Sequence, residues 1–538
     1  MTALDSAASH ADEVPVLIAG GGMVGLAAAT FLAQHGVPSR VIERLEASSP
    51  LPRAAFFHMR TLEMFRSAGI EGRVREQSLK DFVPEGAIVA VESLAGRKLA
   101  DLIPSLNEGV DAVSPCRRLF LNQPSLEPIL RERAREAGAR ILQGHEITGV
   151  RQDADGVSVI AKDSHSGIAR ELRGKYLIAA DGGHSTVREL LGISCDGRGV
   201  FSNSVTIYFT ADLWPWIGDK AWSIIYVNNP VLSGFFRLNR AAQAGFLAVN
   251  TVGDANSNPQ AAANAAADVS EPRLIELVRA GAGVPGLKVQ ITGFSRWRAT
   301  ADVAHKLQDG RIFIAGDAAH VMPPNGGFGG NTDIHDAHNL AWKLALVLKG
   351  QASERLLDTY ESERKPVARF TVEQAFSRYV VRTAPWLQAS QKTEPLAHDF
   401  DIELGYLYGS PAGTHADPRA TFGLPGSRAP HVWLTRKGER VSTIDLTGHY
   451  LLLAGSEGSP WLKAAREVSE HFAGLTLDAH CIGRDLEDPE CRFTDAYGIS
   501  SQGASLVRPD GFVAWRSVGA SESPEAALSA AMRRSLCH

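Results

Sequence analysis

The chain has 538 residues, of which 44% are hydrophobic and 21% are charged, a composition that excludes a disordered protein and permits large buried cores. At about 150 residues per domain, this length predicts three or four folding units. The 55 basic and 60 acidic residues leave a formal net charge of −5, so the sequence lacks the strongly basic character of nucleic-acid-binding proteins.

The sequence argues against a disulfide framework or zinc site, a membrane-spanning helix and a secretory signal. The five cysteines are odd in number and scattered, whereas disulfide frameworks and zinc sites need paired spacings. Apolar stretches fall short of the ~20 residues that a membrane-spanning helix needs. The segment 1–13 has no basic region ahead of an apolar core, as a secretory signal would have. We therefore expect a cytoplasmic protein with no metal site and with neither a nucleic-acid nor a membrane partner.

The first local pattern is that of a nucleotide-binding βαβ unit. The sequence predicts a strand over 14–19, a glycine turn over 20–25, a helix over 26–33 and a second strand over 39–43. In this Gly-x-Gly-x-x-Gly turn, Gly20 permits the tight turn, Gly22 lets backbone N–H groups approach a pyrophosphate, and Gly25 allows close helix packing. Glu43 ends the second strand 18 residues beyond Gly25, where it would accept hydrogen bonds from ribose hydroxyls.

Two arginines follow this unit. Arg44 comes directly after the second strand and Arg53 lies in the next loop. Either they contact the phosphates or the ring of a nucleotide, or they are solvated side chains. We include both among the candidate cofactor ligands.

A second pattern places an acidic residue at the end of another strand. The strand predicted over 176–180 runs into Asp181 and Gly182, and Ser185 and Arg188 follow. Asp181 and the Gly182 backbone could face a ligand at the carboxyl end of a parallel sheet. The alternative is a helix N-cap at Asp181, with Arg188 in a salt bridge.

A third pattern combines a strand end with a glycine-dense loop. Asp317 follows the strand predicted over 311–316 and could hold the sugar-alcohol chain of a flavin. The next loop carries Pro324, Gly327, Gly329, Gly330 and Asn331, and a helix is predicted over 337–349. Four glycines in the five residues 326–330 are costly in backbone entropy, which favours a functional loop. The positive end of the helix would suit an anionic ligand.

Between residues 200 and 291 the sequence pattern becomes typical of β-structure, with strands predicted over 205–209, 222–227 and 245–249. We interpret this region as an inserted, largely antiparallel sheet. Six of its aromatic residues are expected mainly in the core, with one or two stacking on a flat substrate: Trp214, Trp216, Trp222, Tyr226, Phe235 and Phe236.

The three nucleotide patterns, in this order, resemble the single-component FAD-dependent aromatic hydroxylases, and within them the aromatic-polyketide hydroxylases of the aklavinone, angucycline and tetracenomycin type. The stretches 336–345 and 360–366 match as well, and 505–516 resembles the close of a thioredoxin-like C-terminal domain. The resemblance therefore covers the chain from residue 14 to residue 538.

This resemblance implies an α/β fold with a Rossmann-like FAD-binding domain, an inserted β-sheet substrate domain and a thioredoxin-like C-terminal domain. We assign 14–90, 115–200 and 300–395 to the first, 91–114 and 201–299 to the second, 396–428 to a connector and 429–538 to the last. The C-terminal domain lacks a Cys-x-x-Cys motif, because Cys481 and Cys491 are ten residues apart. Its role would be structural or in assembly rather than in dithiol chemistry.

The resemblance also supplies site residues. Gln123 matches a glutamine near the ribityl chain of the flavin and joins the candidates named above. The chain departs from the family pattern at Asp333 and His335, where small residues usually follow Asn331 and Thr332. We expect these two side chains to alter the electrostatics beside the pyrimidine edge of the flavin.

The activity implied is a monooxygenase reaction. NADPH or NADH, bound transiently, would reduce FAD, and O2 would yield a C4a-hydroperoxyflavin that hydroxylates a polycyclic phenol or quinone. No pattern marks a catalytic base. Baeyer–Villiger insertion or oxidative rearrangement with the same flavin chemistry, a flavin reductase or dehydrogenase, and a non-enzymatic FAD-binding protein stay open, as does the choice between monomer and homodimer.

Overall fold

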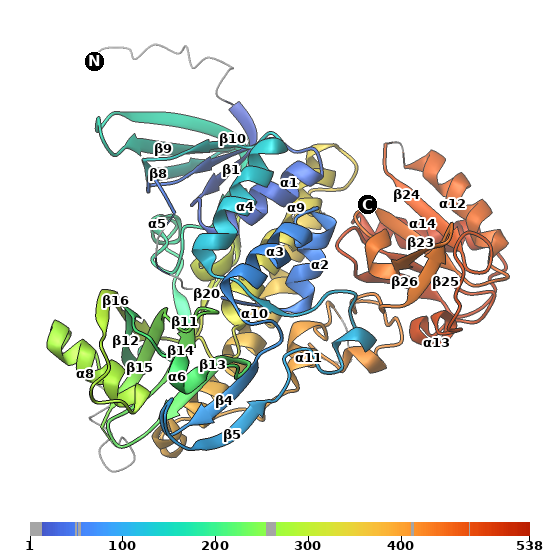
Figure 1. Cartoon of the computed structure of the whole chain (residues 1–538). Helices are drawn as coiled ribbons and strands as arrows, with labels where there is room; N and C mark the ends of the chain where they lie inside the picture. Colours follow the sequence, from blue (N-terminus) through green and yellow to red (C-terminus); the bar gives the residue numbers. More distant parts are fainter. Residues whose placement is uncertain (1–12, 49–50, 52–54, 254–264, 410–413, 473) are drawn as a thin grey trace, which may run out of the picture.

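The computed structural model describes residues 13–48, 51, 55–253, 265–409, 414–472 and 474–538. Figure 1 shows three bodies: a mixed sheet with helices at the top, a second sheet below it, and a C-terminal domain beside helices α2 and α3. The candidate ligand Arg53 lies outside the described residues.

The first sheet is parallel at its centre. Its strands run in the order β18-β19-β10-β1-β2-β7, and the β8–β9 hairpin extends it antiparallel from β10. Their bounds are β1 (Glu13–Ala19), β2 (Ser39–Ile42), β7 (Arg140–Leu142), β8 (His145–Gln152), β9 (Val157–Asp163), β10 (Ala169–Ala179), β18 (Gln308–Asp309) and β19 (Ile312–Ile314). The apolar runs of β1 and β10 are fully buried, as expected for parallel strands covered on both faces.

Helices cover this sheet. Helix α1 (Met23–Gln34) packs between α4 (Gln123–Glu136) and α9 (Phe328–Leu348). The remaining helices of this body are α2 (Met59–Ser67), α3 (Glu71–Asp81), α5 (Thr186–Leu190) and α10 (Arg355–Arg382), and two small sheets pair β3 (Phe56–Phe57) with β6 (Leu119–Phe120) and β11 (Cys195–Gly197) with β17 (Asp302–Ala304) and β20 (His320–Val321).

Helix α9 begins earlier than predicted from the sequence. The helix expected from residue 337 starts at Phe328, so Gly329, Gly330 and Asn331 belong to its first turn rather than to a loop. The turn is made by Gly326 and Gly327, whose φ angles are 92° and 69°. Glycine adopts this left-handed region without strain. The chain can therefore turn at these two residues and begin the helix at Phe328.

The second sheet has seven strands in the order β16-β12-β15-β14-β13-β4-β5. Its bounds are β4 (Ala87–Val91), β5 (Lys98–Ile103), β12 (Ser202–Thr210), β13 (Trp222–Asn228), β14 (Leu232–Leu238), β15 (Ala244–Val252) and β16 (Gln290–Ala299). All neighbours are antiparallel except β13 and β4. One face packs against α8 (Glu271–Ala282); the short α6 (Trp214–Ile217) lies near the same sheet.

The predicted boundary between residues 90 and 91 falls inside strand β4. The reason is that β4 pairs with both β13 and β5, so the chain has already entered the second sheet at Ala87. The sequence reads as a short apolar run at this point, and periodicity does not reveal its partners.

The C-terminal domain has a thioredoxin-like fold. Its sheet order is β24-β23-β25-β26, with β23 and β24 parallel and the other pairs antiparallel. The elements are β23 (Tyr450–Ala454), α12 (Ser459–His471), β24 (Leu477–Cys481), α13 (Phe493–Tyr497), β25 (Ala504–Val507), β26 (Val513–Ser517) and α14 (Pro524–Ser535), preceded by α11 (Asp399–Glu403), β21 (Trp433–Arg436) and β22 (Glu439–Ser442). All five cysteines of the chain are free thiols.

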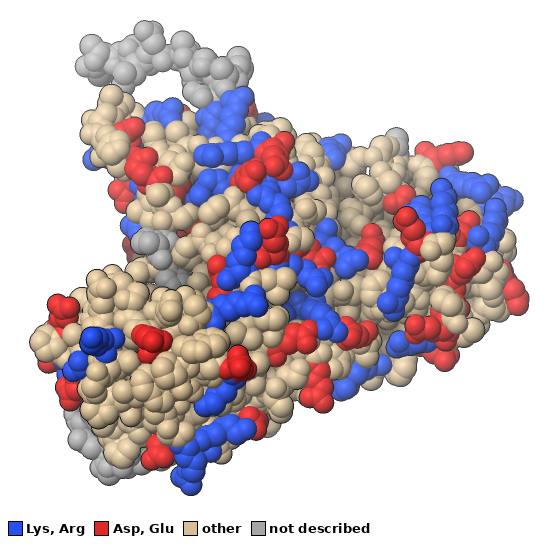
Figure 2. Space-filling model, viewed as in Figure 1, with Lys and Arg blue, Asp and Glu red and all other residues tan. Residues whose placement is uncertain are grey.

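Surface charge is mixed on the face shown in Figure 2. Basic and acidic side chains intermingle over all three bodies, and among the described residues on this face no stripe of a single sign runs across the molecule. This distribution agrees with the small net charge of the sequence.

Buried ion pairs join the C-terminal region to the first body. Glu63 of α2 accepts from Arg60 Nη1 at 3.0 Å and from Arg428 Nε at 3.0 Å. Against the effect of burial, Arg428 and Arg60 lower the pKa of Glu63 to about 2. A second cluster joins Glu363 to Lys343 Nζ at 2.7 Å and to Arg508 Nη1 at 2.6 Å. Each carboxylate thus neutralises two buried cations from different parts of the chain.

We expect Glu63→Gln to lower the free energy of unfolding by about 3–5 kcal/mol, because it leaves buried guanidinium groups without a counter-charge. The depressed pKa means that the Glu63 contribution is complete above its ordinary value of 4.5 and is lost as pH falls toward 2. Urea unfolding at several pH values measures this. Glu76→Gln, at the exposed pair with Lys80, is the control and should leave stability unchanged; equal effects of the two substitutions would contradict the account.

Candidate functional site

A cavity of about 560 Å³ lies where the first sheet meets the second. Its lining comes from the carboxyl ends of β1, β2, β10 and β19 on one side and from β4, β13, β14 and β15 on the other. Ligands of open parallel sheets bind at these strand ends, and the volume lies within the usual range for small-molecule sites.

Most of the residues singled out in the sequence meet in this cavity. Twelve line it: Gly20, Gly22, Glu43, Arg44, Gln123, Asp181, Gly182, Asp317, Pro324, Gly327, Gly329 and Gly330. Gly25 and Asn331 do not. The structure therefore brings the three nucleotide patterns, far apart in sequence, to one sheet edge.

The first glycine turn shows why glycine is needed. Gly20 has a φ of 93°, and a Cβ there would lie 2.3 Å from the carbonyl oxygen of Ala180. A Cβ on Gly25 would lie 1.9 Å from the carbonyl oxygen of Gly20, so Gly25 serves helix packing rather than ligand contact. A Cβ on Gly22 would meet only Glu127 Oε1, at 3.7 Å, which leaves this backbone open to a ligand.

Glu43 is already oriented by the turn. Its Oε2 accepts from the backbone N–H of Gly21 at 2.5 Å and its Oε1 from that of Leu45 at 2.8 Å. The carboxylate is held at the cavity rim, with further lone pairs for hydroxyl groups of a ligand.

Asp181 combines the two roles considered for it. It lines the cavity, and it also accepts from Ser185 Oγ at 2.5 Å and from the backbone N–H of Val187 at 3.0 Å at the start of α5. The expected salt bridge from Arg188 is absent: its guanidinium donates to the carbonyl oxygens of Ala318 at 2.8 Å and Gly183 at 3.0 Å. Arg188 thereby ties the second pattern to the third.

The third pattern is fixed by a buried ion pair. Asp336 of α9 accepts from Arg364 Nε at 2.7 Å and from the backbone N–H of Gly316 at 3.1 Å, and His320 Nε2 lies 2.7 Å away. Asp336 and Arg364 are fully buried. Although burial acts in the opposite direction, Arg364 and His320 lower the pKa of Asp336. The ionised carboxylate thus positions the backbone from which Asp317 faces the cavity.

The side chain of Asn331 makes structural hydrogen bonds and does not line the cavity. Its side-chain oxygen accepts from the backbone N–H of His58 at 2.9 Å and from Thr61 Oγ1 at 2.7 Å, while its nitrogen donates to the carbonyl oxygens of Phe56 and Gly327. All side-chain hydrogen-bonding groups are engaged, so Asn331 fastens the start of α9 to α2.

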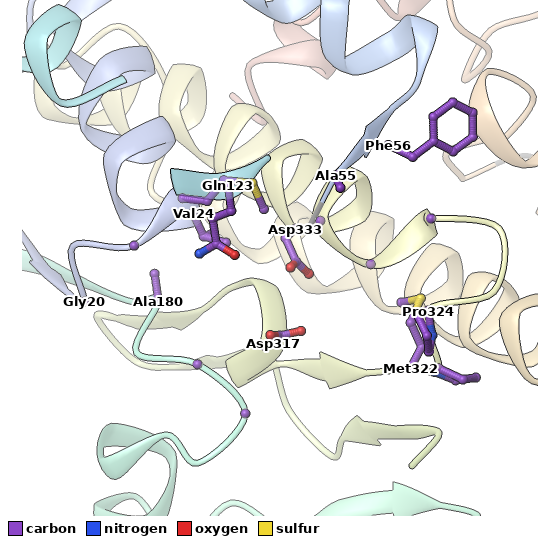
Figure 3. A pocket seen from close by; sticks show the side chains of 18 of the residues that line it. Gly20, Val24, Ala55, Phe56, Gln123, Ala180, Asp317, Met322, Pro324 and Asp333 are labelled. Atoms are coloured by element: carbon purple, nitrogen blue, oxygen red, sulfur yellow. The ribbon is translucent and has the colours of Figure 1, made fainter. Parts of the chain in front are cut away.

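Of the two residues that depart from the family pattern, Asp333 lines the cavity and His335 does not. His335 is buried beside Thr61 Oγ1, at 3.0 Å, and does not line the cavity. Asp333 lines the cavity, and in Figure 3 its carboxyl group points toward the side of the cavity where Asp317 lies. Its Oδ1 is buried without a hydrogen-bond partner, 3.6 Å from the equally unpartnered Nδ1 of His320. Burial, aided by the charges of Asp317 and Asp336, raises the pKa of Asp333 well above its ordinary value.

The second sheet supplies an aromatic wall. Tyr226, Phe235 and Phe246 line the cavity with Ile224 and Arg237. Of the six aromatic residues considered from the sequence, Tyr226 and Phe235 face the cavity, whereas Phe236 is in the core on the opposite face of β14. Sequence reasoning missed Arg237. The signal that finds it is the two-residue alternation that places Phe235 and Arg237 on one face of the strand.

Membrane-spanning helices and metal-ligand clusters are both absent from the described residues. None of the described helices is long and apolar enough to cross a membrane. Within the same residues, no three His, Cys, Asp or Glu side chains gather as a metal site would require.

We expect Asp333→Asn to raise the melting temperature by a few degrees at pH 8 and to leave it unchanged near pH 4. The wild-type carboxyl group has a raised pKa in the folded protein, so wild-type stability falls as pH rises above the ordinary value of 3.8, and the neutral amide avoids this loss. Thermal melts across this pH range test it, with the exposed Asp219→Asn as control. A difference that is constant with pH would contradict the assignment.

Comparison with known proteins gives matches along nearly the whole chain. Residues 13–375 match the model of the FAD binding domain family, and residues 422–537 match the C-terminal domain of aromatic-ring hydroxylases. The chain is 48% identical to 4-methyl-5-nitrocatechol 5-monooxygenase from Burkholderia sp, with 98% of each chain covered. It is 38% identical to the tetracenomycin B2 monooxygenase-dioxygenase of Streptomyces olivaceus, covering 97% of this chain and 99% of the relative.

Solved structures give the same family assignment as the sequence comparisons. The crystal structure of a ternary complex of aklavinone-11 hydroxylase with FAD and aklavinone superposes with a TM-score of 0.89 at 36% identity, covering 98% of this chain and 99% of the other. These matches confirm the fold and the FAD cofactor expected from the three nucleotide patterns. The chain belongs to the FAD-dependent aromatic-ring hydroxylases and is a flavoprotein monooxygenase.

Proposed function

We propose that this monooxygenase hydroxylates a phenolic aromatic ring held against the aromatic wall of the cavity, with NADPH or NADH as transient electron donor. The observation that carries the proposal is one continuous cavity with nucleotide-binding glycines at one end and Tyr226, Phe235 and Phe246 at the other. The substrate is either a polycyclic phenol, as for the tetracenomycin and aklavinone relatives, or a substituted catechol, as for the nitrocatechol relative.

The residues present fit FAD. Gly182 has nothing within 4 Å of its Cβ position, and the Cβ positions of Gly22 and Gly329 each have a single neighbour at 3.7 Å. These backbone surfaces therefore leave room for a closely packed ligand. Glu43 would hold the adenosine ribose, Asp317 and Gln123 the ribityl chain, and the Gly22 turn the pyrophosphate. When bound, FAD supplies the electron transfer and the oxygen chemistry.

The protein itself provides charge and shielding. Gly329 and Gly330 belong to the first turn of α9 and line the cavity, and backbone N–H groups in a first helical turn lack intrahelical partners. Together with the helix dipole they stabilise negative charge at this edge. Phe56, Met322 and Pro324 line the same cavity, and Met322 and Pro324 lie side by side at this edge in Figure 3. These apolar side chains would limit the access of water to the reacting atoms.

We propose the domain limits given above, with the first transition moved to residue 87, together with the cofactor-binding roles of the twelve residues that line the cavity. A cytoplasmic location and a monomeric or homodimeric state remain predictions from the sequence.

Gly329→Leu should lower FAD affinity at least tenfold while leaving the protein folded. A Cβ at Gly329 meets only Met322 Cγ, at 3.7 Å, so the larger side chain enters the cavity rather than the core. Reconstitution of the apoprotein, followed by flavin fluorescence, measures affinity. Gly72→Leu is the matched control, because Gly72 is also helical and has nothing within 4 Å of its Cβ position. An unchanged FAD affinity of the Gly329→Leu variant would show that the start of α9 does not contact the cofactor.

Anaerobic reduction of bound FAD by NADPH or NADH should be accelerated by the true substrate, and aerobic turnover should add one oxygen atom to it. Stopped-flow bleaching with a panel of polycyclic phenols and substituted catechols, followed by product mass, selects the substrate. Rapid reduction without any aromatic compound and without oxygenated product would instead identify a reductase. Insertion of oxygen into a ring, visible in the product structure, would identify Baeyer–Villiger chemistry.

A further inference from the structure

One cation in the aromatic wall, Arg237, forms no ion pair with any residue that the structure describes. Arg237 of β14 is 4% exposed, and its Nε and Nη2 are buried without hydrogen-bond partners. Buried guanidinium groups are normally paired, since an unpaired buried charge is costly. Elsewhere in this chain buried arginines are paired: Arg428 forms an ion pair with Glu63, and Arg508 forms one with Glu363.

Aromatic rings hold the guanidinium of Arg237 in place. Its Cζ lies 4.1 Å from the ring centroid of Phe82 and 4.6 Å from that of Phe120. Stacking of this kind uses the faces of the planar group and leaves the in-plane N–H donors free. Arg237 is therefore oriented by packing while its hydrogen-bonding edge stays available to a ligand in the cavity that it lines.

Neighbouring carboxylates do not satisfy this edge. Asp81, the acidic group that acts on Arg237, accepts hydrogen bonds from Gln77 at 3.0 Å and from Ser125 at 2.9 Å. Burial lowers the pKa of Arg237 to about 9, and Asp81 acts in the opposite direction. Because this value stays above neutral pH, the side chain remains a cation in the working enzyme.

The acidic groups along the cavity lie elsewhere or are engaged, and a second cation, Arg382 at the end of α10, also lines the cavity. Glu43, Asp181 and Asp317 belong to the nucleotide end. Asp399 pairs with Arg378 at 2.8 Å. Around Arg237 the lining is apolar or aromatic, namely Ile88, Ile103, Ile224, Tyr226, Phe235 and Phe246. An apolar sheet face with the Arg237 guanidinium in it suits an aromatic ring that carries an anionic oxygen substituent.

We propose that Arg237 binds an anionic oxygen group on the aromatic substrate, so that the enzyme selects acidic phenols in their ionised form over neutral aromatic compounds. This inference rests on the proposed function, because it assigns the substrate class of the same cavity. A guanidinium can bind two oxygens side by side, as a catecholate or a nitrophenolate presents them. Arg237 acts here as a specificity-determining residue.

The test uses holoenzyme without pyridine nucleotide, so that no turnover occurs, and 4-nitrocatechol as the probe. Difference absorbance reports both the affinity and the ionisation of the bound phenol. The wild-type protein should bind the anion and lower the apparent pKa of the phenol below its value in water. It should bind the neutral dimethyl ether of the probe at least tenfold more weakly.

Arg237→Met should weaken binding of the anion about 10- to 100-fold, as expected for loss of a charged hydrogen bond, and leave binding of the ether unchanged. Arg237→Lys should retain part of the affinity. Arg240→Met is the matched control, because Arg240 is exposed in the turn after β14 and donates to the carbonyl oxygen of Leu79. FAD content and circular dichroism establish that each variant is folded.

Several results would overturn the inference. Equal affinity of the folded Arg237→Met and wild-type proteins for the anion would do so. If Arg237→Met does not fold, the wild-type titration alone decides, and a raised apparent pKa of the bound phenol, or tighter binding of the ether, rejects the proposal. Oxygenation of neutral aromatic compounds with no role for Arg237 would leave the proposed function intact. Arg237-dependent binding without any oxygenated product would reject the proposed function alone.

Discussion

The Asp336–Arg364 ion pair is the interaction on which the cavity depends. Arg364 of α10 also donates to Tyr408 OH at 3.1 Å and to the carbonyl oxygen of Thr332 at 3.2 Å. One buried pair thus connects the turn at Gly316, both long helices and the connector to the C-terminal domain. Loss of either partner would leave the other charged and buried, which costs several kcal/mol, and would release the backbone that carries Asp317.

Charge in the cavity is divided between its two ends. Glu43, Asp181 and Asp317 lie at the nucleotide end, where the pyrophosphate of FAD is also expected. Asp333 adds a carboxyl group there, and burial raises its pKa well above the ordinary value. The β-sheet wall of the substrate end is apolar or aromatic except for the Arg237 cation. This division suits a reaction in which a phenol must be ionised for the ring to be electron-rich, while negative charge on the cofactor is met by the start of α9.

That Gly20, Glu43, Asp181 and Asp317 meet at one end of the cavity could be predicted from the sequence, because each of them follows a strand end. These residues are adjacent to apolar runs, and parallel strands bring such positions to one edge. Glycine content misled the reasoning at α9, since Gly329 and Gly330 were expected in a loop although the first helical turn accommodates them. Asn331 was expected to be a ligand from its position alone, whereas its hydrogen bonds to Phe56, His58 and Thr61, which are distant in sequence, could not be foreseen. The substrate wall was harder still, because it depends on how β14 pairs with β15, including a register shift between Ser233 and Gly234.

The most direct test of the account is a crystal structure of the holoenzyme with FAD and 4-nitrocatechol. The account predicts the adenosine ribose at Glu43, the flavin beside Gly329 and Gly330, and the aromatic ring on the β14 wall with an oxygen within hydrogen-bond distance of Arg237. An aromatic ring bound outside this cavity, or one whose oxygens all face away from Arg237, would contradict it.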